Sequence, residues 1–78
     1  MDEQQRMATE LAEVELLIGA ITGRCADLEN AVGVMAGLGA DTAPADAALL
    51  ATYHALGLHS RRRATLIRML DSFRDGAC

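Results

Sequence analysis

Two cysteines and two histidines are the residues of this chain that most readily support nucleophilic or metal chemistry. His54 and His59 are five residues apart, a spacing that does not bring two side chains to one face of a helix. No Asp, Glu or Cys completes a ligand set at metal-binding spacing. Cys25 falls within a regular series of apolar residues, where cysteine behaves as a small hydrophobe, and Cys78 is too distant to reach it. We therefore expect no metal ion, no cofactor and no disulfide.

Carboxylates at Glu10, Glu13 and Glu15 are the remaining group that could act in acid/base catalysis. We expect arginines beside them and no pocket around them. The chain has no Gly-rich phosphate loop and no Ser/His/Asp or Cys/His arrangement that a small helical protein could bring together. Small helical mutases gather several cations around a pocket, whereas this chain has no Lys. The sequence thus indicates a protein without enzymatic activity.

The basic residues form one cluster, Arg61–Arg63, flanked by His59 and followed by Arg68. The formal net charge is −4, and nucleic-acid binding normally needs a basic surface that releases counterions from phosphates. Three adjacent helical residues point in three directions, so at most two of them serve one face. We expect the cluster to be solvated or paired within the chain, and we expect no nucleic-acid partner.

The elements that position these side chains are helices, because the first half of the chain has an apolar residue at alternating steps of four and three. Such a 3.5-residue period keeps one side of a helix against a partner helix over its whole length, as in a coiled coil. No segment alternates apolar and polar residues as a strand would. We call this series the inner seam; its members are Met7, Leu11, Val14, Ile18, Ile21, Cys25, Leu28, Val32 and Met35.

A single break divides the chain near its middle. Residues 37–44 contain glycines that can end a helix, an Asp41–Thr42 pair that can cap the next one, and Pro44, which is tolerated in a first turn. We therefore expect helices over about residues 3–38 and 43–75 with a turn at 39–42. Two such helices fold back antiparallel, which predicts an all-α, coiled-coil-like helical hairpin forming one domain over residues 1–78.

Folding about residues 41–42 would place residue i opposite roughly residue 83 − i. Leu66 then faces Leu17, Phe73 faces Leu11, and Arg61–Arg63 face residues 19–22. Glu10, Glu13 and Glu15 lie alongside Arg68 and Arg74 in this register. The expected shared interface contains Leu11, Val14, Ile18, Ile21, Leu28, Leu49, Leu56, Leu66, Leu70 and Phe73.

Small residues repeat on the other side of the first helix, in two Gly-x-x-x-Gly spacings. A helix-interior Gly costs about 1 kcal/mol relative to Ala, so several on one solvated face require an explanation. One alternative is a weak stretch of helix, and the other is a binding face that admits a close partner helix. The candidate partner-binding residues of this outer face are Ala12, Leu16, Gly19, Gly23, Ala26, Gly33, Val34 and Gly37.

No segment reads as a membrane span or a cleavable signal peptide. The longest uncharged run, residues 47–58, is shorter than the roughly 20 apolar residues that a bilayer requires. The first residues lack a basic region followed by an apolar stretch. We expect a cytoplasmic protein without membrane insertion.

The layout resembles that of small helical-hairpin components of bacterial type III secretion systems. Residues 42–73, with Pro44 in the turn followed by Leu49, Leu50 and Tyr53, look like the second helix of needle subunits. The whole chain, acidic and poor in aromatic residues, looks more like the YscE-type co-chaperones that hold needle subunits in the cytosol within a heterotrimer. Needle subunits carry N-terminal aromatic residues, whereas here the heptads begin at Met7.

This resemblance implies a virulence-associated chaperone in protein transport that binds helical proteins in a hetero-oligomer, with a homo-oligomer also possible. A needle- or inner-rod-type subunit that polymerises is one alternative. A small regulator that sequesters another protein is a second alternative. All three act through protein–protein interaction rather than catalysis.

Overall fold

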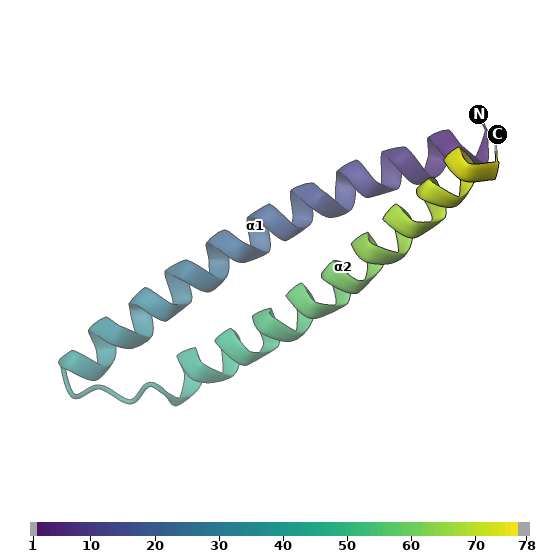
Figure 1. Ribbon diagram of the computed structural model, residues 1–78. Coiled ribbons are helices and arrows are strands. Elements are labelled where there is room, and N and C mark those ends of the chain that lie inside the picture. The colour runs from purple at the N-terminus through teal and green to yellow at the C-terminus, as the bar shows by residue number, and fades with distance from the viewer. Residues whose placement is uncertain (1, 77–78) are drawn as a thin grey trace.

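Two long antiparallel helices make up the structure, a computed structural model that describes residues 2–76. Helix α1 spans Glu3–Gly37 and helix α2 spans Ala43–Gly76. They lie side by side as a rod of 61 × 16 × 15 Å, with the loop at one end and the start of α1 and the end of α2 at the other (Figure 1). Residues 2–76 contain no strand. The expected all-α hairpin is confirmed, and each helix boundary lies within one residue of its expected position.

Helix α1 begins and ends with recognisable caps. The backbone N–H of Gln5 donates to the Asp2 carboxylate over 2.7 Å, which satisfies one of the free amides of the first turn. At the other end Gly39 has φ +73°, a left-handed conformation that costs Gly little. The N–H of Ala40 donates to the carbonyl of Met35 over 2.9 Å, the 6→1 bond of a Schellman motif. The chain therefore reverses immediately after Leu38.

The Asp41–Thr42 pair starts α2, as the sequence predicted. The Asp41 carboxylate accepts a hydrogen bond from the N–H of Ala43 over 3.0 Å. The Thr42 hydroxyl donates to the Asp46 carboxylate over 2.9 Å, and the Thr42 carbonyl accepts from the N–H of Asp46. Pro44 follows in the first turn, where its missing N–H has no intrahelical partner to lose.

The inner seam faces α2 along its whole length, since all nine of its residues are buried or half-buried. The core cluster contains Met7, Val14 and Leu66, and Leu66 is fully enclosed at 0% exposure. Leu11, Ile18 and Leu70 pack against these three residues. The other expected interface residues, Ile21, Leu28, Leu49 and Leu56, are half-buried. The core cluster therefore lies in the half of the hairpin away from the loop.

The register differs from the expected one by about three residues. Helix α1 ends at Gly37 and α2 begins at Ala43, so the loop is centred on residue 40. Residue i therefore lies opposite about residue 80 − i. Leu66 accordingly joins Val14 in the core, whereas its expected neighbour Leu17 is 47% exposed. The early reversal at Leu38 causes the shift, and the heptad repeat tolerates it because three residues is close to one helical turn.

The neighbours of Phe73 and of the arginine cluster also differ from those that the sequence predicted. Phe73 lies near Met7 instead of facing Leu11, and it remains 38% exposed. Arg62 forms an ion pair with Glu10 at 2.6 Å, and Arg63 forms one with Glu15 at 3.3 Å. These two side chains therefore contact an earlier part of α1 than the expected residues 19–22. Long arginine side chains extend toward the acidic turns of α1 and reach partners that we had assigned to Arg68 and Arg74. The sequence predicted a cluster that is solvated or paired within the chain, and Arg62 and Arg63 are paired within the chain.

Candidate functional site on the outer face of α1

The candidate partner-binding residues all lie exposed on the side of α1 that faces away from α2. Leu16 is 77% exposed and Val34 is 56% exposed, high values for large aliphatic side chains. The six small residues between and around them are exposed as well. We call this surface the outer face; it comprises Ala12, Leu16, Gly19, Gly23, Ala26, Gly33, Val34 and Gly37.

The glycines of the outer face are not required by the packing of the hairpin. A Cβ atom added at Gly19, Gly23, Gly33 or Gly37 would meet no heavy atom within 4 Å. None of the four has a positive φ, so no backbone conformation calls for glycine either. Each of the helix-interior positions lowers helix stability by about 0.5–1 kcal/mol relative to Ala. No contact within residues 2–76 compensates for this loss of helix stability.

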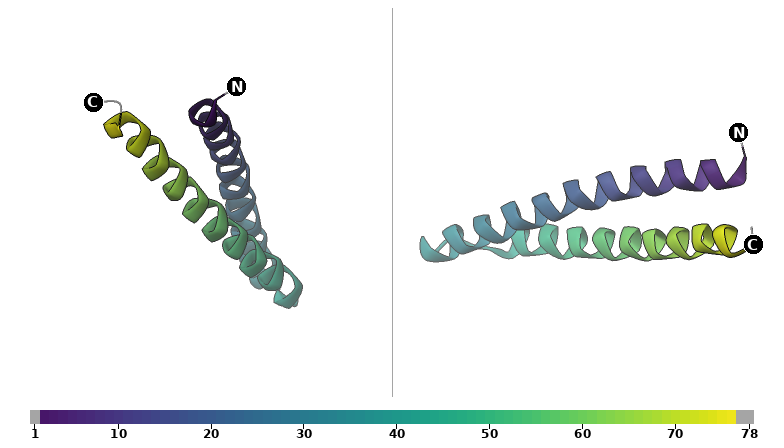
Figure 2. Two further views of the ribbon diagram at one scale, coloured as in Figure 1. Left: turned by 90° about the vertical axis from the view of Figure 1, so that its right-hand side faces the viewer. Right: turned by 45° about the horizontal axis from the view of Figure 1, so that its top comes forward.

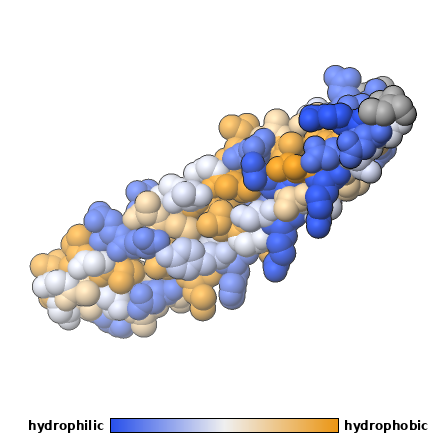
Figure 3. All heavy atoms as spheres, in the orientation of Figure 1, coloured by the Kyte–Doolittle hydropathy of each residue, from blue (hydrophilic) through white to orange (hydrophobic). Residues whose placement is uncertain are grey.

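Large apolar side chains are also exposed beyond the outer face. Leu38 is 79% exposed at the end of α1, and Leu50 and Leu58 are more than half exposed on α2. In the view of Figure 3 hydrophobic and hydrophilic residues are interspersed along most of the rod, and hydrophilic residues predominate near the end opposite the loop. Neither Leu38 nor Asn30, which continues the outer face between Ala26 and Gly33, was among the predicted site residues. The heptad spacing of the outer face would have included Asn30.

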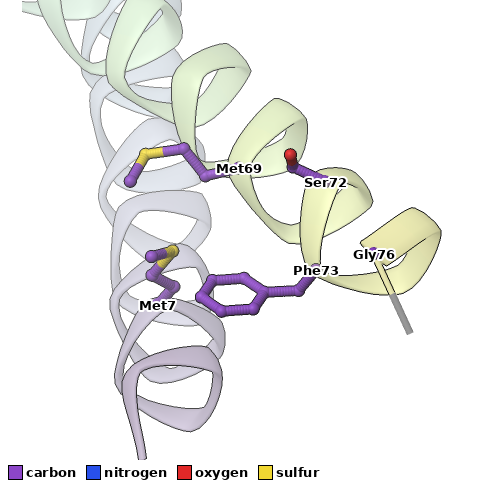
Figure 4. A pocket seen from close by; sticks show the side chains of 5 residues that line it. All are labelled: Met7, Met69, Ser72, Phe73 and Gly76. Atoms are coloured by element: carbon purple, nitrogen blue, oxygen red, sulfur yellow. The ribbon is translucent and has the colours of Figure 1, made fainter.

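An apolar hollow lies between the helices at the end of the hairpin opposite the loop. Both views of Figure 2 show the helices diverging from the loop toward this end. Met69 and Phe73 of α2 and Met7 of α1 point into the same space, and Ser72 and Gly76 complete its lining (Figure 4). The lining offers one hydroxyl and no charged group, so the hollow suits an apolar side chain. Divergence of the helices has no signal in a heptad pattern, and the sequence did not predict this hollow.

Tyr53 makes a polar side-chain contact between the two helices. Tyr53 of α2 is 44% exposed, and its hydroxyl donates a hydrogen bond to the Glu29 carboxylate of α1. That hydrogen bond is the main cause of a raised pKa for the Tyr53 hydroxyl. Arg61, Arg63 and Arg68 line a shallow hollow on α2, and Arg68 donates to the Thr65 hydroxyl over 3.5 Å.

Cys25, Cys78, His54 and His59 are the residues that the sequence offered for nucleophilic or metal chemistry. Cys25 is a free thiol at 5% exposure in the inner seam, consistent with a packing role, while Cys78 lies outside the described residues. No three His, Cys, Asp or Glu side chains in the described part of the chain lie close enough together to hold a metal ion. Neither α1 nor α2 combines the length and apolarity needed to cross a membrane.

The fold and the surface together define a helical hairpin. One face of α1 packs against α2, and the opposite face of α1 is exposed to solvent. Comparison with protein-family models, with curated proteins and with solved structures gave no match.

Proposed function

We propose that the chain is a protein-binding module, and that the outer face of α1 packs against a helix of another protein. The observation that carries this proposal is the set of glycines with open space beyond them, next to Leu16 and Val34. Small residues let two helix backbones approach closely, and the exposed aliphatic side chains supply apolar area to bury. A partner helix would thereby offset the helix stability lost at the glycines.

In its finer form, the proposal is a cytoplasmic co-chaperone that stabilises a type III secretion subunit without catalysis, membrane insertion or nucleic-acid binding. The resemblance to YscE-type co-chaperones supports this form. An acidic two-helix chain with an apolar face that needs cover suits the role. Two alternatives remain. As a needle-type structural subunit the chain would assemble with copies of itself, and as a sequestering regulator it would bind another protein to keep that protein inactive.

The test is co-purification with the native partner from a bacterial host that expresses a tagged copy of the chain. Gly23→Leu should prevent close approach and abolish capture while raising helix stability, because Leu is the better helix former. Leu16→Glu should also abolish capture by placing a charge in a desolvated contact. Stability and binding move in opposite directions for Gly23→Leu, which a simple loss of folding cannot mimic.

Two matched controls separate the outer face from the rest of the surface. Gly57→Leu makes the same substitution on α2, where a Cβ atom also meets open space, and Glu3→Lys changes a charge outside the face. Both variants should retain full capture. Full capture by Gly23→Leu and Leu16→Glu as well would refute the proposal. Filaments formed by the purified chain alone, seen by electron microscopy, would favour the structural-subunit form.

A further inference from the structure

Three arginines line the shallow hollow on α2, and their charges are compensated to different degrees. Arg63 forms an ion pair with Glu15 at 3.3 Å. Arg61 and Arg68 line the same hollow, and neither forms an ion pair with a carboxylate of residues 2–76. Carboxylates are not scarce, because the chain carries 11 acidic residues against seven arginines. Two uncompensated positive charges therefore lie near each other on the surface of an acidic protein.

Arg61 and Arg68 belong to one exposed face of α2. They are seven residues apart, which is about two helical turns, and Ala64 lies between them on the same face. All three residues are exposed. Ile67 is half-buried and adds an apolar border to the hollow. We call this surface the basic face; it comprises Arg61, Ala64, Ile67 and Arg68.

Thr65 orients Arg68 within the basic face. The Thr65 hydroxyl donates to the Arg61 carbonyl over 3.1 Å, so its own hydrogen is already used. The same hydroxyl accepts a long hydrogen bond of 3.5 Å from the Arg68 guanidinium. The Arg68 side chain therefore lies back toward the N-terminus of α2, the direction in which helical side chains ordinarily lean. Its remaining N–H groups are left for a partner.

The spacing of the two arginines favours two carboxylates over a single anion. Seven residues of α-helix rise about 10.5 Å, and helical side chains lean in one common direction. The guanidinium groups of Arg61 and Arg68 therefore stay about two turns apart, farther than one phosphate or carboxylate can bridge. Two carboxylates seven residues apart on another helix have the same separation of about 10.5 Å. An acidic helix that lies along α2 can thus pair with both arginines at once.

Ala64 allows such a helix to approach closely. A partner residue midway between the two carboxylates would lie over Ala64, which is midway between the two arginines. Ala64 and Ile67 give that residue an apolar contact, so an apolar side chain fits there better than a polar one. A nucleic-acid strand would instead meet a chain of net charge −4. The basic face therefore matches an acidic helix with an apolar residue between its charges.

We propose that the basic face of α2 binds a helix of another protein that carries two carboxylates seven residues apart and an apolar residue midway between them. Each carboxylate pairs with one arginine, and the apolar residue covers Ala64 and Ile67. This inference does not depend on the proposed function, because the outer face is on α1 and the basic face is on α2. The hairpin has two separate binding surfaces, one apolar and one basic.

NMR titration of the isotope-labelled, full-length chain with a synthetic peptide tests this proposal. The peptide is an alanine-rich helix with two glutamates seven residues apart and a leucine midway between them. At low ionic strength it should shift the side-chain Nε–H signals of Arg61 and Arg68 together with the amide signal of Ala64. A peptide with glutamine in place of both glutamates should cause no such shift. A peptide with its glutamates two residues apart, on different faces of the helix, should bind more weakly.

Arginine substitutions test whether the basic face makes the contact. Arg61→Gln and Arg68→Gln should each weaken peptide binding about two- to fivefold, the range for one exposed ion pair. Arg24→Gln is the matched control, because Arg24 is also exposed and also lacks an ion pair within residues 2–76. It makes the same change in net charge and should leave the affinity unchanged. Gly23→Leu on the outer face should leave peptide binding unchanged as well, so the two proposals can fail separately.

Several results would overturn the proposal. Equal binding of the glutamate and glutamine peptides would show that the carboxylates are not recognised. Equal losses for Arg24→Gln and Arg68→Gln would assign the attraction to net charge. Inorganic phosphate that shifts both arginine signals at a lower concentration than the peptide would indicate a site for a single anion. A sedimentation mass above 8.3 kDa that returns to 8.3 kDa in Arg68→Gln would show that a second copy of the chain occupies the face.

Discussion

Replacing Leu66 with Ala should unfold the hairpin more effectively than any other single truncation of a side chain within residues 2–76. Leu66 is the one large side chain there that is fully buried, and it belongs to the core cluster with Met7 and Val14. Leu→Ala at such a site costs about 2–5 kcal/mol, from lost transfer free energy and from the cavity left behind. A core of this size supplies no more than about 3–5 kcal/mol in total. The variant should therefore lose most of its helical signal at 25 °C.

Leu58→Ala is the matched control, because the chemical change is the same and Leu58 is 61% exposed. Its free energy of unfolding should lie within about 0.5 kcal/mol of the parent value. Urea titrations followed by circular dichroism at 222 nm, at one protein concentration, measure both variants. Equal midpoints for Leu66→Ala and Leu58→Ala would show that the hairpin does not depend on this core, and would refute the assigned register.

Three further outcomes follow from individual contacts. The single tyrosine, Tyr53, should titrate at 295 nm above its ordinary pKa of 10.0 in the folded chain, and Glu29→Ala should lower that midpoint; the stability from this hydrogen bond is full below pH 10 and is lost as the pH rises through the higher folded-state pKa. Arg62→Gln and Arg63→Gln should each cost about 0–1 kcal/mol, since both ion pairs are exposed, and the loss should vanish in 1 M NaCl. Cys25→Ser should cost about 1–3 kcal/mol in urea titrations by burying a hydroxyl, yet leave partner capture intact, and loss of capture with the fold preserved would reveal a thiol function.

The inner seam could be predicted because it has no interruption, and the break between the helices because Gly, Asp–Thr and Pro occur there together. The register could not be predicted, since a heptad pattern stays apolar on apolar when one helix slides by about a turn. Gly37 and Gly39 are both able to end a helix, and only the left-handed φ of Gly39 determines where the chain reverses. Because the chain reverses there, Leu66 packs in one cluster with Val14 instead of facing Leu17, as the sequence predicted.

The outer face illustrates a different limit. Its exposure follows from heptad positions, because residues opposite the inner seam must face away from α2. Under the proposed function a helix of another protein covers this face, and the sequence of this chain alone does not specify that protein.

The position of the core also has a consequence for biosynthesis. Val14 and Leu66 belong to one cluster but are separated by most of the chain, so the contact between them closes a long loop. A ribosome must extend the chain through Leu66 before that cluster can assemble. Until then the nascent α1 exposes its inner seam as well as its outer face, and an inner seam without α2 is an aggregation hazard. The time that the ribosome takes to complete α2 therefore sets how long the inner seam stays exposed.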